Sequence, residues 1–125
     1  MKLLDTAVAI DHLRGAGSAR ELLRRLIGAR VRIGASEVVR FELLAGVRQA
    51  EISDLEDFCA TLVWFPVDTD VARLGGALAR RYRPRYGGIE DVDYLIAATA
   101  LLLDAELLTT NVLHFPMLEG LRPAY

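Results

Sequence analysis

Four short apolar runs alternate with longer stretches of helical periodicity along the whole chain. Each run is too short to form a helix and reads as a buried strand. The four expected strands are residues 3–4, 31–34, 62–65 and 106–109. Short strands that alternate with helices favour a parallel sheet covered on both faces. The pattern therefore predicts an α/β protein, in which ligands would sit at the carboxyl ends of the strands.

The stretches between these runs carry recognisable helix starts. Capping boxes at Ser18–Glu21 and Ser53–Glu56 each precede apolar residues at helical spacing. Ser36 is placed to cap a further helix. Two longer helices are expected at about 69–82 and 91–103.

Length and composition limit the functional classes. The 125 residues fit one domain, residues 1–125. The net charge of -2 gives no overall positive field that would attract nucleic acid. The only cysteine, Cys59, excludes a disulfide framework and favours a reducing, cytoplasmic location. No apolar run is long enough for a membrane span. The apolar fraction of 53% suggests surface reserved for a second copy.

Three acidic residues stand where acids are not expected. Asp5 directly follows the first strand, and Glu42 lies among apolar positions of its helix. Asp93 opens a helix whose next ten residues carry no charge, so that helix is expected to be almost completely buried. A carboxylate in apolar surroundings needs a proton, a cation or a donor. For Glu42, an ion pair with Arg40 or Arg48 is the structural alternative.

Asp5 and Asp93 also have purely structural interpretations. Asp5 can begin a turn or cap a short helix. Asp91 and Asp93 both lie in a first helical turn, where acids interact favourably with the helix dipole. Positions two apart on a helix point in different directions, so only one of these two should face Asp5. Asp93, which adjoins the uncharged run, is the expected one.

Taken together, the three acids indicate a metal centre. Carboxylates gathered at strand ends repel one another, which raises their pKa values or requires a cation. Oxygen ligands without cysteine or histidine point to Mg²⁺ or Mn²⁺. Such ions polarise phosphates and activate bound water, so the expected chemistry is phosphodiester hydrolysis without a protein nucleophile.

Four segments in this order resemble the PIN-domain ribonucleases, and more narrowly the VapC toxins of bacterial toxin–antitoxin pairs. They are Leu3–Thr6, Glu42–Gly46, Asp93–Ala100 and Leu108–Phe115. The resemblance implies a three-layer αβα sandwich around a short parallel sheet, and a homodimer. It also implies Mg²⁺- or Mn²⁺-dependent endoribonuclease activity and a VapB-like antitoxin that blocks the site.

The resemblance also assigns residues. The three family acids fall on Asp5, Glu42 and Asp93 as catalytic metal ligands, and Thr6 would hold a ligand or the water in place. The fourth acidic position falls on Asn111, which cannot carry a charge but can hydrogen-bond metal-bound water. This departure puts a second metal ion in doubt.

A local basic strip is the expected RNA-binding surface. Arginine pairs with phosphates and stacks on bases, and tyrosine stacks as well. The alternative is a solvated helix end, where arginine interacts favourably with the dipole. His114 is read as a packing residue with no role in proton transfer. The candidate RNA-binding residues are Arg80, Arg81, Arg83, Arg85 and Tyr86, with Arg14 as a further one.

Other functions fit the sequence less well. Lys2 is the only lysine, whereas a phosphoacceptor receiver domain needs one late in the chain. The Gly-Lys-Ser or Gly-Lys-Thr of a Walker-type nucleotidase is absent. The remaining alternative is a PIN fold that binds RNA or a partner without cleaving, and Asn111 leaves room for it.

Overall fold

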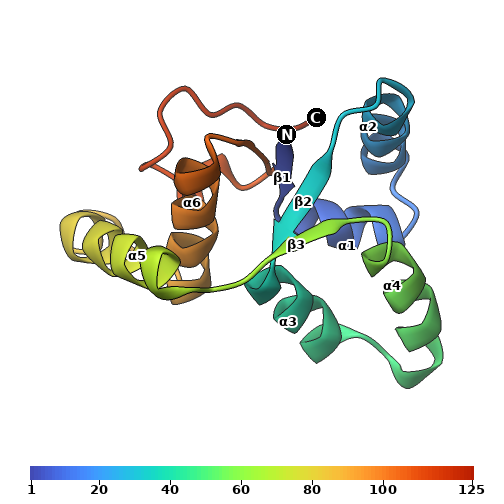
Figure 1. Ribbon diagram of the computed structural model, residues 1–125, viewed down its shortest axis with the longest axis horizontal. Helices are drawn as coiled ribbons and strands as arrows, with labels where there is room; N and C mark the ends of the chain where they lie inside the picture. Colours follow the sequence, from blue (N-terminus) through green and yellow to red (C-terminus); the bar gives the residue numbers. More distant parts are fainter.

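A computed structural model describes all 125 residues of the chain (Figure 1). Its four strands form one parallel sheet with the order β3-β2-β1-β4, which confirms the predicted sheet. The strands are β1 Lys2–Leu4, β2 Ile33–Ser36, β3 Val63–Phe65 and β4 Glu106–Leu108.

Helices flank the sheet on both sides. Figure 1 shows α5 and α6 on one side and α1, α2 and α4 on the other, with α3 near the carboxyl ends of the strands. The arrangement confirms the three-layer αβα sandwich. The helices are α1 Thr6–Leu13, α2 Gly17–Gly28, α3 Glu37–Gly46, α4 Ile52–Cys59, α5 Thr69–Tyr82 and α6 Asp91–Leu103, with short 3-10 turns η1 Gln49–Glu51 and η2 Val112–His114.

The second strand lies two residues later than predicted. All four residues of β2 are buried, including Gly34 and the polar Ser36, because β2 lies between two other strands. A β-carbon at Gly34 would lie 2.6 Å from Cε2 of Phe65 on the neighbouring strand. Small residues are therefore needed here, and the prediction from apolar runs favoured the wrong end of the segment.

Both predicted capping boxes are wrong. Helix α2 begins at Gly17, so Ser18 already lies inside the helix and caps nothing. Helix α4 continues directly from η1 and begins at Ile52, which likewise places Ser53 inside. Ser36 is a cap as predicted, since its hydroxyl accepts a hydrogen bond from the amide of Val38 at 3.2 Å.

Helix α6 is the most deeply buried helix, but only over its first part. Ile96 and Ala97 are fully buried in the core beside Leu3 and Leu4 of β1. Leu101, Leu102 and Leu103 expose 36–50% of their surface, so the expectation of an almost completely buried helix is wrong for the last turn. Successive helical residues point in directions about 100° apart, so three consecutive leucines cannot all face one core.

No helix in the structure combines the length and the apolar character needed to cross a membrane.

Candidate active site

Asp5 lies at the carboxyl end of β1 and is almost completely buried. Its backbone amide donates to the carbonyl oxygen of Leu108 at 3.0 Å, which fixes it beside the end of β4. One carboxylate oxygen caps α1 by accepting from the amide of Thr6 at 2.8 Å, and the other accepts from the hydroxyl of Thr109 at 2.6 Å. No cationic side chain forms an ion pair with Asp5. The helix-cap interpretation of Asp5 is thus correct, and it leaves the negative charge without a counter-ion.

Glu42 projects from α3 toward the same strand end. Its Oε1 accepts a hydrogen bond from the Thr6 hydroxyl at 2.7 Å, which ties α3 to the start of α1. Arg40 instead pairs with Glu37 at 2.7 Å, and Arg48 lies near a different acid. The alternative in which an arginine neutralises Glu42 is therefore wrong.

Asp93 and Asp91 differ sharply in their surroundings. Asp93 is only 9% exposed, and its Oδ2 accepts from the amide of Glu90 at 3.1 Å and lies 3.4 Å from Nδ1 of His114. The side chain of Asp91 is 86% exposed and pairs with Arg83 at 2.5 Å. Asp93 is therefore the acid of this pair that faces the interior.

The three acids share one electrostatic environment. Burial raises the pKa of the Asp5 carboxyl, and hydrogen bonds from Thr109 and Thr6 oppose that rise only in part. Burial also raises the pKa of Asp93, and the charges of Asp5 and Glu42 raise it further. Together with the hydrogen bond from Thr6 to Glu42, these influences indicate that Asp5, Glu42 and Asp93 lie within electrostatic reach of one another at the carboxyl end of the sheet.

The residues present suit a hard divalent cation. The donors are carboxylate oxygens, and Asp5 uses two of its roughly four acceptor positions on protein donors, which leaves others open. The structure contains no group of three or more histidine, cysteine, aspartate or glutamate side chains that could hold a metal ion. Mg²⁺ does not require one, because it keeps several waters and commonly binds one or two protein carboxylates.

Thr109 is a site residue that sequence reasoning missed. Its hydroxyl donates to Asp5 and accepts from the backbone amide of Asn111 at 2.9 Å. The sequence contained a signal for this contact, because Thr109 directly follows β4 and Asp5 directly follows the adjacent parallel strand β1, so the two residues lie at the same edge of the sheet. Asn111 itself is exposed and enters this network through its backbone, with no side-chain hydrogen bond to the acids.

The sequence indicates only a packing role for His114, whereas in the structure its imidazole is the one basic group within ion-pair distance of any of the three acids. It is about half exposed and contacts Asp93. Its charge lowers the pKa of both Asp5 and Asp93, in opposition to burial. The Asn-x-x-His spacing, in which Asn111 precedes the turn η2 and His114 is its last residue, was the available signal.

The predicted RNA-binding residues surround the end of α5 and the loop before α6. The Arg81 guanidinium lies 5.6 Å from the ring of Tyr82, whose ring centroid is 5.8 Å from that of Tyr86. Arg83 is held by Asp91, as described above. This surface meets the first turn of α6 through the Arg83–Asp91 pair.

Arg14 lies on a different surface, in a groove between α1, α3 and α4. The groove has a volume of about 560 Å³ and includes Glu42. Its walls mix apolar residues, Leu13, Leu43 and Leu55 among them, with the charged Arg48, Glu51 and Asp54. The structure thus places Arg14 in the same groove as Glu42 and Arg48, on a different surface from the arginines of the basic strip.

We expect Asp5→Asn to raise the melting temperature of the metal-free protein by roughly 2–5 °C at neutral pH, the shift produced by about 1 kcal/mol in a domain of this size. The folded-state pKa of Asp5 is raised, so the folded protein binds more protons than the unfolded chain above pH 3.8. The charged Asp5 therefore destabilises the folded parent protein fully at pH values above its folded-state pKa. This destabilisation disappears as pH falls to 3.8, the pKa in the unfolded chain. The gain should therefore shrink on acidification.

Thermal unfolding of both proteins in EDTA across a pH series measures this difference. Asparagine caps helices about as well as aspartate, so the cap of α1 is retained. A lower melting temperature for the variant at neutral pH would show that the charge of Asp5 stabilises the fold.

Comparison with known proteins agrees with this geometry. Residues 2–112 match the PIN domain family, so the fold and the acidic strand ends define a PIN domain. The chain is 60% identical over its full length to the full length of "Ribonuclease VapC19" from Mycobacterium tuberculosis. It is 41% identical to "Ribonuclease VapC10" of the same organism, over all of this chain and 93% of the relative. The chain therefore belongs to the VapC family of PIN-domain ribonucleases.

A solved structure supports the same fold. A chain of the "Toxin-antitoxin complex from Klebsiella pneumoniae" superposes with a TM-score of 0.82 at 24% identity. The superposition covers 100% of this chain and 98% of that chain.

Proposed function

We propose that this protein is the toxin of a toxin–antitoxin pair and cleaves RNA with a divalent metal ion, Mg²⁺ or Mn²⁺. One observation carries the metal dependence: Asp5 and Asp93 are buried carboxylates with raised pKa values and no cationic side chain bound to Asp5. Such a pair is stabilised when a cation replaces the missing positive charge.

Each acid has a distinct role in this proposal. Asp5 and Asp93 would hold the ion, and Glu42 would hold it directly or through a water. A bound ion would supply an activated water and an electrophile for the phosphate. Thr6 orients Glu42, and Thr109 orients Asp5. Asn111 keeps its exposed amide free for a hydrogen bond to water, and it adds no charge that would support a second ion.

The basic strip and the groove beside Glu42 serve the two proposed partners. The strip, formed by Arg80, Arg81, Arg83, Arg85 and Tyr86, would bind the RNA backbone and unpaired bases. An antitoxin resembling VapB would cover the groove that contains Arg14 and Glu42, and would thereby block the acids. The groove carries the acids Glu42, Glu51 and Asp54 beside its apolar residues, so it suits a protein partner with basic side chains better than the phosphates of RNA.

A homodimer and a cytoplasmic location remain predictions. Exposed apolar side chains such as Phe41 and Leu113, at 66% and 87%, are available for a second copy. Cys59 is buried, as expected of a free thiol in a reducing compartment.

Cleavage should be lost on metal removal and restored by metal addition. Purified protein without antitoxin is incubated with total RNA in EDTA, then with excess Mg²⁺ or Mn²⁺, and fragments are resolved by electrophoresis. We expect at least about 100-fold slower cleavage in EDTA, because the ion supplies both the nucleophile and charge stabilisation. Equal cleavage in EDTA would refute the metal-dependent mechanism, and binding without cleavage under all conditions would favour a non-cleaving PIN module.

A further inference from the structure

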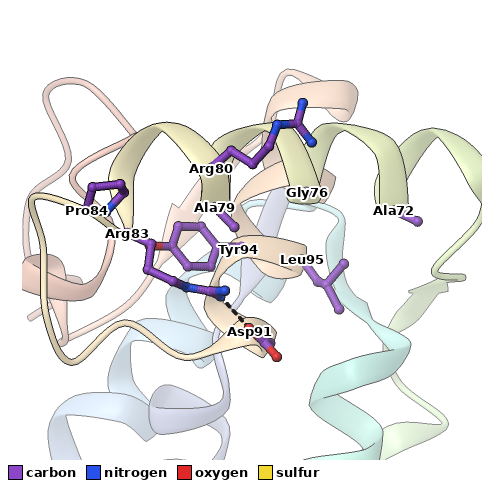
Figure 2. Close-up of a pocket in the computed structure, with 10 residues that line it drawn as sticks. Ala72, Gly76, Ala79, Arg80, Arg83, Pro84, Asp91, Tyr94 and Leu95 are labelled. Atoms are coloured by element: carbon purple, nitrogen blue, oxygen red, sulfur yellow. Dashed lines mark hydrogen bonds and ion pairs between the residues drawn. The ribbon is translucent and has the colours of Figure 1, made fainter.

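A groove of about 640 Å³ runs between α5 and α6 on the outer side of the molecule (Figure 2). Its floor consists of small residues of α5, so the helix backbone is accessible from outside. Gly75 is the point of closest packing, because a β-carbon there would lie 3.1 Å from Leu95 of α6. Gly76 faces open space, and the nearest atom to its β-carbon would be the end of the Arg80 side chain at 3.9 Å.

A buried hydroxyl without a partner lies in the wall of this groove. Tyr94 is only 1% exposed, and its hydroxyl makes no hydrogen bond. Figure 2 shows its ring beside Arg83, whose guanidinium carbon lies 5.3 Å from the ring centroid. Leaving a buried hydroxyl unpaired is unfavourable. The oxygen has almost no accessible surface and Arg83 lies over the ring, so a ligand would gain this hydrogen bond only when the Arg83 side chain turns away from the ring.

The rim of the groove is cationic. Arg80 and Arg83 line it, and Asp91 is the only acid among its residues. Asp91 holds Arg83 from one side, and the guanidinium has further N–H donors available. Asp91 opens onto this groove, whereas Asp93, two residues further along α6, is buried and faces the interior, so the groove is separate from the proposed metal site.

We propose that this groove binds one nucleotide of the RNA strand outside the proposed metal site. The phosphate would pair with Arg80 and Arg83, the flat base would lie on the small-residue floor at Gly76, and the Tyr94 hydroxyl would gain a partner. An RNA strand suits this groove better than an apolar peptide because the rim is basic and because Arg80 and Arg83 also belong to the basic strip. This assignment rests on the proposed ribonuclease function.

Filling the groove should weaken RNA binding without harming the fold. Gly76→Leu places a side chain in the open space above the floor, and leucine is favoured over glycine inside a helix. Gly28→Leu is the matched control, because Gly28 ends α2 and a β-carbon there would also meet no atom within 4 Å. We expect at least about tenfold weaker binding of a short single-stranded RNA for Gly76→Leu, and no change for Gly28→Leu.

Removing the Tyr94 hydroxyl separates a binding role from a structural one. Tyr94→Phe deletes an unpaired buried group, so its melting temperature should stay the same or rise. If the hydroxyl bonds to RNA, affinity should fall about threefold to tenfold, the effect of one hydrogen bond. A purely structural role would leave affinity unchanged.

Binding is measured in EDTA by fluorescence anisotropy, so that it does not depend on the metal site or on cleavage. Equal affinity for the parent, Gly76→Leu and Tyr94→Phe would overturn the proposal, as would failure of the parent to bind RNA without metal. A change in oligomeric state with unchanged RNA affinity would assign the groove to a protein interface instead. Cleavage by the parent with Mg²⁺, assayed separately, shows whether the proposed function itself holds.

Discussion

Asp5→Asn should slow RNA cleavage by at least about 100-fold while the protein remains folded. The substitution keeps the size of the side chain and one oxygen to cap α1, but it removes the negative charge that would attract the metal ion. Thr109 can still hydrogen-bond the amide, because a hydroxyl both donates and accepts. The expected loss is therefore one of catalysis rather than structure.

Two measurements check this expectation. Initial rates on total RNA with Mg²⁺ give the loss in cleavage, with Asp11→Asn on the same helix as a control that should stay within a few-fold of the parent. Mg²⁺ should raise the melting temperature of the parent but not of Asp5→Asn, since a ligand stabilises only the state that binds it. Cleavage by Asp5→Asn at the parent rate would remove Asp5 from the metal site.

Asp93→Asn should lose cleavage by a similar factor, whereas Asp91→Asn should lose far less, within about tenfold. Asp93 is buried and senses the charges of Asp5 and Glu42, while Asp91 is exposed and already paired with Arg83. Both residues lie in the first turn of α6, so both variants lose a similar favourable interaction with the helix dipole. A difference in cleavage rate between the two variants therefore reports which carboxylate belongs to the site rather than a difference in helix stability.

Rates measured side by side on one RNA preparation give this comparison, and the melting temperature of each variant confirms that it is folded. The reverse order, with Asp91→Asn the more damaging, would transfer the third acidic role to Asp91 and contradict the site proposed here.

The longest elements were the most predictable from sequence. Helices α5 and α6 begin and end where the pattern placed them, because each carries a sustained apolar period and has clear flanking signals. The parallel sheet followed from the alternation of strands and helices. Local signals did worse: Ser18 and Ser53 match a capping pattern, but the chain is already helical when it reaches them.

Within the site, the residue types were predictable and their partners were not. Asp5, Glu42 and Asp93 stand out as acids among apolar neighbours, so sequence alone could single them out. The hydrogen bond from Thr109 to Asp5 spans 104 positions, and no local spacing indicates such a contact. The choice of Arg83 to pair with Asp91 rather than remain free likewise depends on how the loop before α6 folds back.

Asp5 and Asp93 each accept a hydrogen bond from a backbone amide at the start of a helix, and each is also one of the three site acids. An alanine scan would confuse these duties, because truncation at either position would loosen a helix end and delete a charge at once. Substitution by an amide of the same shape is the cleaner dissection. This double role also limits which residues can replace Asp5 and Asp93 in evolution. Even a homologue that has lost activity must keep a hydrogen-bond acceptor for the backbone amide at each of these two positions.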